Sequence, residues 1–597
     1  MDTERIYNDL LDLVRVQGIS GTASESLTGE RLLALLGEIP YFRDHPDHLY
    51  KIPVEGDPLG RFDVAAYLDL DPDSPEVVIL TGHYDVVGVE EYGAWSDLAF
   101  DAEKLTAELD QLPLSLSEDA QKDLASGNWL FGRGVADMKL GHALALELLR
   151  HYDELQVQGS GQGFSAADRG NPSAPLKGNL LYLGVCSEET NSEGMRQAVP
   201  FLNRFATERH LHYKAMLLGE CFEFEQEELD LGEVMPRYVH WGSSGKVMPM
   251  FFFVGQTAHE KEPFASLDPN LLASEVYKRM QLNTDFCQQQ AGRTTPPPIC
   301  LKMQDLKSLY SVSNPLYGAA YYNLVTVNLD PASLWQSLMS LARESFVAAL
   351  AYRDERAGAY ADLLGTDPFI TEIQPRVFTY QEIYQAARTA YESNFELASE
   401  SALESTSESA SESALEQVES GQSFAAFLQG KIQAWQDQGL KIQDLAINLV
   451  KELYLLQPIQ EPMIIVSLIP PYYPDVFPEA EKGEGAQLAQ ALKLTQAYAR
   501  EHWQLNLQVK PYYMGICDLC YSGLDDHKDY DQILDNLVGG GEFYKFPLAE
   551  LKEFKVPGLV LGGFGKDFHK ATERLELNYS LKQLPYIYLN LLENLLS

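Results

Sequence analysis

Histidines and carboxylates follow the ends of several short apolar runs in this chain. Imidazole nitrogens and carboxylate oxygens, without thiolate, are ligands that suit a pair of divalent ions, zinc first and manganese or cobalt next. Such a site activates water for hydrolysis. The chain has only 12 histidines, so two of them together with several acids indicate a two-metal site. The residues concerned are His83, Asp85, Asp137, Glu188, Glu189, Glu220 and His569.

The spacing within two of these groups is informative. His83 and Asp85 are two residues apart, so in an extended segment their side chains point the same way and the carboxylate can accept from the imidazole N–H. Glu188 and Glu189 are adjacent like charges, and a cation is the simplest reason to place both at a strand end. A single acid in such a position is often only a helix N-cap, so the interpretation depends on the whole set.

The apolar runs that precede these residues predict buried parallel strands. Near the start of the chain, helical spacing extends to Val14, with Asp2 or Thr3 as the cap. Alternating strands and helices predict an α/β sheet covered on both faces, and ligands of such sheets bind outside the carboxyl ends of the strands. The predicted strands are 77–81, 180–186, 215–218 and 558–561, and the predicted helices include 30–36 and 140–152.

A second, smaller α+β domain interrupts the first. Residues 239–455 have the order strand, helix, strand, helix, which predicts a domain inserted between the two parts of the first domain, 1–238 and 456–597. A Ser/Glu/Ala tract at 396–420 repeats the segment SESALE and predicts a solvated insertion, and the Gly/Ser/Pro-rich stretch 159–175 predicts a surface loop. The predicted elements of the inserted domain are strands at 246–254 and 321–327 and helices at 271–280 and 332–351.

Composition restricts the partners and the compartment. The formal net charge is −42, which repels polyphosphate and excludes nucleic acid as a partner. The chain has no run of about 18 uncharged apolar residues and its start is acidic, so we expect no membrane-spanning segment and no signal peptide. Six cysteines are too few for a disulfide framework and predict the reducing cytoplasm. Cys517 and Cys520 have CxxC spacing, but the further residues that a zinc or redox motif needs are not recognisable.

Four motifs of the chain resemble, in order and in strand context, those of the M20 metallopeptidases, the group of aminoacylase, carboxypeptidase G2 and succinyl-diaminopimelate desuccinylase. The matches are spread over most of the chain. Three further segments are similar to the subgroup of the arginine-utilisation protein RocB. The M20-like motifs are His83-Tyr-Asp85, Gly132-Arg-Gly-Val-Ala-Asp137-Met-Lys139, Ser187-Glu188-Glu189 and Leu218-Gly219-Glu220. The RocB-like segments are Pro470-Pro-Tyr-Tyr-Pro474, Gly515-Ile-Cys-Asp518-Leu-Cys-Tyr521 and Gly565-Lys-Asp-Phe-His569-Lys-Ala-Thr-Glu573-Arg574.

This resemblance implies a zinc-exopeptidase-like catalytic domain with a mostly parallel sheet and a ferredoxin-like satellite domain with extra helices. It also implies a ligand set for two zinc ions. Asp137 bridges the ions, His83 and Glu220 bind one, and Glu189 and His569 bind the other. The implied activity is cleavage of an amide bond in a small peptide or N-acyl amino acid by a metal-bridging water.

Three catalytic roles follow from the same resemblance. Glu188 is the general base, and Asp85 orients His83. Gly255-Gln-Thr-Ala-His259 resembles the glycine-to-histidine motif of the family, whose histidine reaches across a dimer to the partner's active site. A homodimer through the satellite domain is the corresponding expectation.

Several assignments stay open. Cys221-Phe-Glu223 stands where the family has proline, so Glu223 competes with Glu220, which is preferred because it directly follows a strand. His142 is expected to be a packed or surface histidine, and Lys566 either contacts substrate or is a solvated loop charge. The arginine motif of the satellite domain is not recognisable, so the substrate-binding residues and the substrate are unknown. The alternative function is a non-catalytic M20-like binding or regulatory protein in arginine utilisation.

Overall fold

The chain folds into two compact units. The computed structural model describes residues 1–112, 116–159, 176–224, 236–401, 422–457 and 461–596. Unit 1 comprises Met1–Ser244, Pro474–Asp526 and Pro547–Ser597, and unit 2 comprises Gly245–Tyr473 and His527–Phe546. The sequence pattern placed the inserted part at 239–455. Unit 2 continues to Tyr473 because a strand beyond residue 455 pairs within its sheet, and it takes in a further short segment from the C-terminal part.

Unit 1 is built on a central eight-stranded sheet, with the strand order β1-β2-β5-β3-β6-β17-β7-β16. The middle of the sheet is parallel, because β3 pairs in parallel with β5 and β6, and β17 pairs in parallel with β6. The predicted α/β class and mostly parallel sheet are confirmed. The strands are β1 (Leu49–Pro53), β2 (Phe62–Leu68), β3 (Glu76–His83), β5 (Asn179–Val185), β6 (His212–Leu218), β7 (Arg237–Trp241), β16 (Leu507–Lys510) and β17 (Gly558–Val560).

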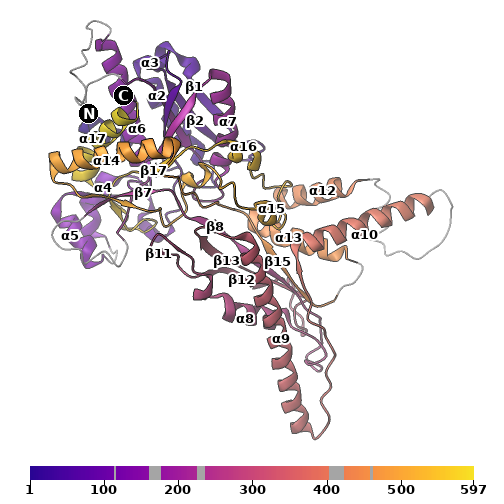
Figure 1. Cartoon of the computed structure of the whole chain (residues 1–597). Coiled ribbons are helices and arrows are strands. Elements are labelled where there is room, and N and C mark those ends of the chain that lie inside the picture. The colour runs from indigo at the N-terminus through magenta and orange to yellow at the C-terminus, as the bar shows by residue number, and fades with distance from the viewer. Residues whose placement is uncertain (113–115, 160–175, 225–235, 402–421, 458–460, 597) are drawn as a thin grey trace. The chain divides into compact units, whose positions relative to one another are not determined.

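Helices cover both faces of this sheet, so β2 and β5 are buried along their whole length. In Figure 1, α6 and α17 lie on one side of the strands and α7 and α16 on the other. The four strands predicted from apolar runs are β3, β5, β6 and β17, all confirmed within one or a few residues. The helices are α1 (Thr3–Arg15), α2 (Glu25–Gly37), α3 (Pro40–Asp44), α4 (Ala102–Glu108), α5 (Glu118–Ser126), α6 (Lys139–Gly159), α7 (Glu193–Arg209), α14 (Gly483–Trp503), α16 (Leu548–Glu553) and α17 (Leu584–Leu595).

The register of the parallel strands brings their carboxyl ends to one edge. His83 at the end of β3 lies opposite Val185 of β5, and Thr81 lies opposite Leu218 of β6. Leu218 in turn lies opposite Val560, the last residue of β17. The segments that follow β3, β5, β6 and β17 therefore begin side by side, as expected for residues that follow parallel strands.

The start of the chain is fixed to this unit by two local devices. The Asp2 side chain accepts hydrogen bonds from the backbone N–H groups of Glu4 and Arg5, so α1 begins with the predicted cap. At its other end, the fully buried Lys139 donates from Nζ to the carbonyl oxygens of Leu13 (2.9 Å) and Gln17 (2.8 Å). An ammonium group at these last carbonyls complements the negative end of the helix dipole.

A small three-stranded sheet completes unit 1, with the order β18-β19-β4. It pairs the C-terminal hairpin β18 (Gly565–Lys566) and β19 (Arg574–Glu576) with β4 (Trp129–Phe131), so that Arg574 lies opposite Phe131. Two segments more than 400 residues apart in sequence are thereby joined beside the main sheet.

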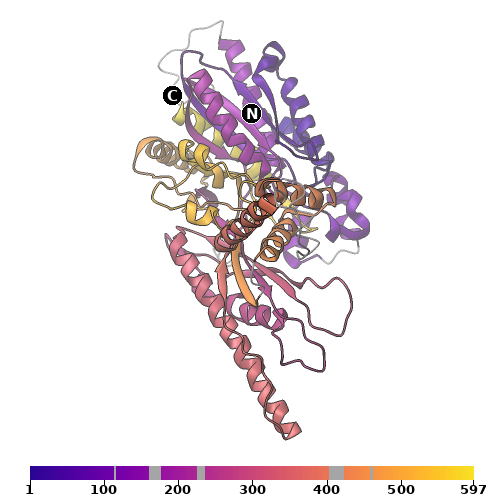
Figure 2. The same ribbon diagram turned by 90° about the vertical axis from the view of Figure 1, so that its right-hand side faces the viewer.

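Unit 2 has its own sheet, with the order β12-β13-β9-β15-β14 and with β8 paired to β13. Met250, Phe252 and Val254 of β9 share a hydrophobic core with α10, α12 and α13. The helix α9 is a single continuous helix of 34 residues (Figure 2), longer than the predicted 332–351. The elements are β8 (Gly245–Val247), β9 (Pro249–Val254), α8 (Pro269–Met280), β10 (Gln289–Gln290), β11 (Arg293–Thr294), β12 (Ile299–Asp305), β13 (Tyr317–Thr326), α9 (Pro331–Leu364), β14 (Val377–Thr379), α10 (Tyr380–Ser401), α12 (Phe424–Asp437), α13 (Ile442–Leu455), β15 (Met463–Leu468) and α15 (Asp531–Leu534).

Two predicted insertions fall largely outside the described residues. The Ser/Glu-rich tract 396–420 begins within α10, and the rest of it from residue 402 lies outside them, as does nearly all of 159–175. In the described part of the chain, none of the helices combines the length and apolar character needed to cross a bilayer.

Candidate metal centre

Two triads of ligating side chains meet at the carboxyl edge of the unit 1 sheet, and they share one aspartate. The first contains His83, Asp137 and Glu220, and the second contains Asp137, Glu189 and His569; within each triad the ligand atoms all lie within 4.8 Å of one another. Asp137 Oδ1 is 3.2 Å from His83 Nε2, and Asp137 Oδ2 is 2.9 Å from His569 Nε2. The aspartate thus presents one oxygen to each half of the site.

The remaining carboxylates lie on the outer sides of the two histidines. Glu220 Oε2 is 3.3 Å from His83 Nε2, and Glu189 Oε1 is 3.2 Å from His569 Nε2. Every residue that the sequence singled out as a ligand is therefore in the cluster, in the grouping that the resemblance implied. His569 is half exposed at its side chain, whereas the other four are largely buried.

The elements explain how five residues so distant in sequence converge. His83 ends β3, and Glu220 stands two residues beyond β6. Asp137 lies between β4 and α6, and His569 lies in the connection from β18 to β19, so the pairing of β4 with β19 brings these two together. His569 itself has a left-handed backbone (φ 63°), a conformation that non-glycine residues adopt rarely and that sites tolerate when the surroundings enforce it.

The electrostatics of the cluster are those of a cation site. Burial would raise the pKa of Asp137, but hydrogen bonds with His569 and His83 hold it below its ordinary value. Those same contacts with Asp137 and Glu189 raise the pKa of His569 to about 11. Burial and the neighbouring Asp137 raise the pKa of Glu220 to about 7. The carboxylates therefore favour positive charge at the positions between them.

The donor set fits a pair of divalent ions. Glu220 Oε1 is buried and has no hydrogen-bond partner among the described residues, which is costly unless something else binds it. Imidazole nitrogens with carboxylate oxygens suit zinc, and the shared Asp137 supplies one oxygen for each ion. The residues that would hold the two ions are thus all present.

Asp85 supports this edge differently from the sequence prediction. Its Oδ1 accepts from the backbone N–H of Glu188 (3.1 Å), and its Oδ2 accepts from that of Glu189 (3.2 Å) and from the Ser20 hydroxyl (2.5 Å). His83 Nδ1 is 3.0 Å from the backbone carbonyl of Asp85 and 3.6 Å from its carboxylate. The carbonyl is therefore the nearer acceptor for the imidazole N–H, and the carboxylate mainly fixes the turn that carries both glutamates.

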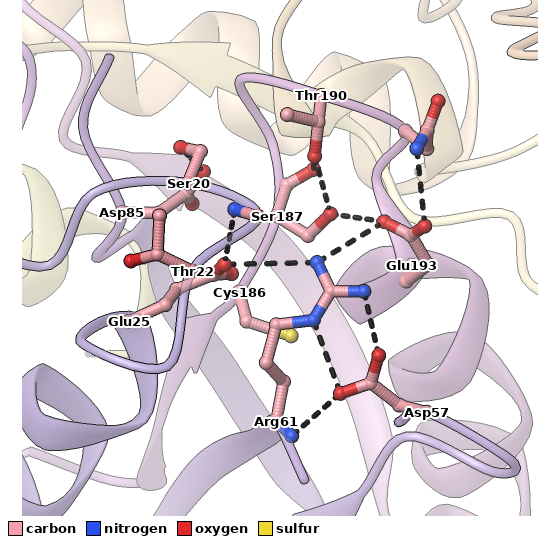
Figure 3. Close-up of polar contacts among 12 residues, drawn as sticks. Ser20, Thr22, Glu25, Asp57, Arg61, Asp85, Cys186, Ser187, Thr190 and Glu193 are labelled. Atoms are coloured by element: carbon pink, nitrogen blue, oxygen red, sulfur yellow. Dashed lines mark hydrogen bonds and ion pairs between the residues drawn. The ribbon is translucent and has the colours of Figure 1, made fainter. Parts of the chain in front are cut away.

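A second group of side chains contacts the same turn and stabilises it (Figure 3). The Ser187 hydroxyl donates to Glu193, and Ser187 has a left-handed backbone (φ 63°) directly before Glu188. Arg61 Nη1 lies 3.6 Å from both Glu193 Oε2 and Glu25 Oε2, while its Nη2 donates to Asp57 (2.9 Å). One buried guanidinium thus connects three acids from separate segments.

Glu573 performs the corresponding task for the Asp137 loop. Its Oε1 accepts from the backbone N–H groups of Gly134 (2.8 Å), Ala136 (3.3 Å) and Asp137 (3.3 Å), and its Oε2 accepts from Arg133 Nη1 (2.6 Å). In the sequence, Glu573 is recognisable only as part of the RocB-like segment that contains His569. This shared segment was the available sequence signal for Glu573. Its carboxylate lies four residues after His569 in the chain and accepts hydrogen bonds from the loop that carries Asp137.

Glu188 directly precedes Glu189 in the chain but is a member of neither ligand triad. Its side chain is largely buried, and burial raises its pKa, with Glu189 and Asp518 adding to the rise and His83 opposing it. It occupies the carboxyl edge of the sheet beside the ligand Glu189. Its assignment as the general base stays a prediction.

The open alternatives resolve in favour of Glu220. Glu223 is exposed and accepts from the backbone N–H of Asp567 (3.1 Å), away from both triads. His142 is buried, with Nε2 2.6 Å from the His83 carbonyl and Nδ1 2.8 Å from the Tyr182 hydroxyl, and burial lowers its pKa to about 3. It is a packed histidine that supports the backbone of a ligand.

Two other residues have structural partners. Lys566 Nζ pairs with Asp119 (2.9 Å) and Asp123 (2.8 Å), so it is neither solvated alone nor directed to the ligand cluster. His259 belongs to unit 2, where it is exposed and its Nδ1 accepts from the backbone N–H of Lys261 (3.3 Å). Its catalytic role stays a prediction.

Comparison with known proteins gives two relatives over nearly the whole chain, although no protein-family model matches. Uncharacterized protein YqjN from Bacillus subtilis is 29% identical over 577 residues, covering 96% of this chain and 93% of that protein. Protein RocB from the same organism is 24% identical over 592 residues, covering 98% of this chain and 94% of RocB. The chain is similar to RocB over nearly its whole length. The relationship to RocB that the motifs predicted is confirmed.

Solved structures with similar chains include a tripeptidase from Staphylococcus aureus (TM-score 0.46, 11% identity, 100% of this chain and 99% of that chain). They also include an M20 family metallo-carboxypeptidase from Sulfolobus solfataricus (TM-score 0.45, 10% identity, 100% and 99%).

Proposed function

We propose that this protein is a metal-dependent hydrolase that cleaves an amide bond of a small peptide or N-acyl amino acid. The observation that carries the proposal is the position of Asp137, whose two carboxylate oxygens each face a different histidine. A purely structural aspartate would pair with a protein cation or cap a helix, whereas this one stands between two sets of ligands. Zinc is the proposed metal, and the reducing cytoplasm is the proposed compartment.

The chain's own residues supply positioning and proton transfer in this scheme. Two bound ions of the zinc class supply Lewis acidity and make a nucleophilic water available at neutral pH. Glu188, whose backbone N–H is held by Asp85, would take the proton from the attacking water and return it to the leaving nitrogen. Asp85, which accepts from the Ser20 hydroxyl, and Glu573 hold the two loops that carry the proposed ligands, so the geometry is set before substrate arrives.

A homodimer through unit 2, with His259 acting on the partner's site, belongs to the same proposal. The edge strand β12 leaves the alternate apolar side chains of Ile299, Leu301 and Met303 exposed, a surface that a second copy would cover. In such a dimer His259 would donate to the developing oxyanion, a contact whose loss typically costs about 10²- to 10³-fold in rate. Light scattering tests this part, since a fully active monomer contradicts it.

The rival function is a binding or regulatory protein that keeps the fold without catalysis. All five ligands and the base are present in the described site, which favours the enzyme. The deciding experiment is a hydrolysis assay with dipeptides and N-acyl amino acids, with zinc, manganese or cobalt added, before and after chelation. We expect chelator-sensitive hydrolysis and about two ions per chain by elemental analysis. A metal content near zero at saturation contradicts the proposal.

A further inference from the structure

Arg61 is a buried guanidinium that belongs to neither ligand triad and directly precedes β2. Asp57 fixes its direction. Arg61 Nε and Nη2 donate to the two Asp57 carboxylate oxygens (3.1 and 2.9 Å), and the Arg61 backbone N–H donates to the same carboxylate (2.7 Å). A bidentate pair of this kind orients the planar guanidinium. Its Nη1 then lies 3.6 Å from two further acids, Glu193 and Glu25.

Glu193 connects Arg61 to the turn that carries Glu188 and Glu189. It is the first residue of α7, and its carboxylate accepts from the hydroxyl of Ser187 (Figure 3). Ser187 directly precedes Glu188 and has a left-handed backbone (φ 63°), which a residue with a side chain adopts rarely unless its neighbours enforce it. Because Ser187 is fully buried, that enforcement has to come from contacts within the protein.

Glu25 connects Arg61 to the same turn through a different loop. Glu25 Oε2 accepts from the backbone N–H of Gly21 (2.8 Å). The adjacent Ser20 donates from its hydroxyl to Asp85 (2.5 Å), and Asp85 accepts from the backbone N–H groups of both glutamates of the turn. Two series of contacts that start at one guanidinium therefore end on the consecutive residues 187–189.

We propose that Arg61 is a positioning residue for the candidate metal centre, because it holds the left-handed backbone at Ser187 and the loop of Gly21 and thereby fixes the direction of Glu188 and Glu189. This inference rests on the proposed two-metal hydrolase and adds to it a residue outside the ligand set. The effect is indirect. A change of backbone conformation at Ser187 would reorient both glutamates, so the proposed ligand and the proposed base should be impaired together.

Zinc binding tests this inference without an assay of catalysis. Arg61→Lys keeps the positive charge, but an ammonium group cannot keep the bidentate contact with Asp57 while it reaches two other acids. The variant should bind one of its two zinc ions about tenfold less tightly, measured by competition with a chelating dye. A wild-type zinc affinity in the folded variant overturns the proposal.

Arg150→Lys is the matched control. Arg150 is also largely buried in unit 1, where it joins α6 to α1 through its ion pair with Asp9. Its replacement should lower the melting temperature without changing the zinc affinity. If both variants lose zinc affinity equally, any weakened ion pair of unit 1 loosens the site, and the specific role of Arg61 is overturned.

Two substitutions at Ser187 test the backbone conformation directly, and they do so even if Arg61→Lys fails to fold. Both remove the hydroxyl contact with Glu193, but glycine adopts the left-handed region without the penalty that alanine pays. Ser187→Gly should therefore bind zinc at least about threefold more tightly than Ser187→Ala, and it should recover part of the affinity that Arg61→Lys loses. Equal affinities for the two Ser187 variants contradict the proposal.

Kinetics at saturating zinc separate this inference from the proposed function. If the protein hydrolyses an amide, Arg61→Lys should lower kcat by about tenfold or more with little change in KM, because Glu188 is misdirected while both ions are bound. An unchanged kcat overturns the proposal. If no amide is hydrolysed, the proposed function fails, but the zinc affinities of the Arg61, Arg150 and Ser187 variants should still differ as described.

Discussion

Unit 1 contains two acidic clusters whose negative charge is balanced by different positive groups. The ligand cluster gathers Asp137, Glu189 and Glu220 around two histidines, with no lysine or arginine paired to them among the described residues. The other cluster lies on the same C-terminal hairpin and surrounds Arg574. Both are built from carboxylates of distant segments, so the comparison isolates the source of the positive charge.

In the Arg574 cluster the protein itself provides the cations. Arg574 Nε donates to Asp123 (2.7 Å), Nη2 donates to Asp119 (2.6 Å), and Nη1 donates to Asp567. Lys566 adds a second cation to two of these acids. Burial would raise the pKa of Asp567, but its basic neighbours keep it below the ordinary value.

The difference distinguishes an acidic cluster that stabilises the fold from one that binds a ligand. Acids paired with arginine are complete without any added ion. Acids whose only cationic neighbours are histidines can exchange those protons for metal, because the imidazole nitrogens are themselves ligands. Four predictions test whether the two clusters really divide in this way.

The largest effect is expected for Asp137→Asn. Loss of the shared carboxylate removes a ligand from both triads, so metal content should fall below one ion per chain and hydrolysis by at least about 10³-fold. Elemental analysis and kcat/KM measure the two outcomes. Asp123→Asn, in the Arg574 cluster, is the matched control and should keep its metal. Equal metal loss in both variants would show that the clusters are not different in kind.

Glu188→Gln should separate catalysis from metal binding inside the ligand cluster. Glu188 is the proposed base and belongs to neither triad, so the variant should retain about two ions while kcat falls by about 10²- to 10⁴-fold. A near-normal kcat on the preferred substrate contradicts the assignment as base. Loss of metal would instead make Glu188 a ligand.

Arg574→Met should affect stability and leave metal binding intact. The substitution leaves the buried Asp123 and the half-buried Asp567 without their main cation, and breaking such a pair costs about 3 kcal/mol in the free energy of unfolding. Denaturant titration measures the loss. If the folded variant also fails to bind metal, the two clusters are coupled through the hairpin and cannot be treated as separate.

Much of the candidate site could be predicted from the sequence because it depends on which residues directly follow buried strands. Buried strands are continuous apolar runs, and the residues that follow them must meet at one edge of a parallel sheet, so His83, Glu189 and Glu220 could be grouped from the amino-acid sequence alone. Asp137 and His569 belonged to the same candidate set, but the division of the five residues between two ions depended on the family motifs. The contact between Asp137 and His569 is made by β4 and β19, two strands too short to give a periodic signal.

Two kinds of feature could not be predicted from the sequence: which strands pair with one another, and which polar atoms have or lack hydrogen-bond partners. The strand β15 is a buried apolar run like those of unit 1, and nothing in its composition tells which sheet it joins, so the bounds of the inserted unit were not predictable. Nothing in the sequence distinguishes Asp518 within its segment, because the absence of donors around a carboxylate is a property of three-dimensional packing. The same holds for the backbone contacts of Glu573 and Asp85.

The smallest effect on stability is expected at Arg61, where one cation is shared by three acids. This arginine serves Asp57, Glu25 and Glu193 together, and burial, with the charge of Asp85 adding to it, raises the pKa of Glu25 to about 8. The folded protein therefore keeps a proton on Glu25 that the unfolded chain releases above about pH 4.5. That contribution to stability is complete at low pH and is lost as the pH rises through about 8.

Glu25→Gln removes this dependence, since an amide keeps the hydrogen bond from the Gly21 N–H without titrating. In the chelated protein, the unfolding free energy of the variant should gain on that of the wild type between about pH 5 and 8, by no more than about 1.4 kcal/mol per pH unit. Urea unfolding across this range measures the difference. Parallel curves for the two proteins would mean that Arg61 keeps Glu25 ionised, which would place this network with the Arg574 cluster.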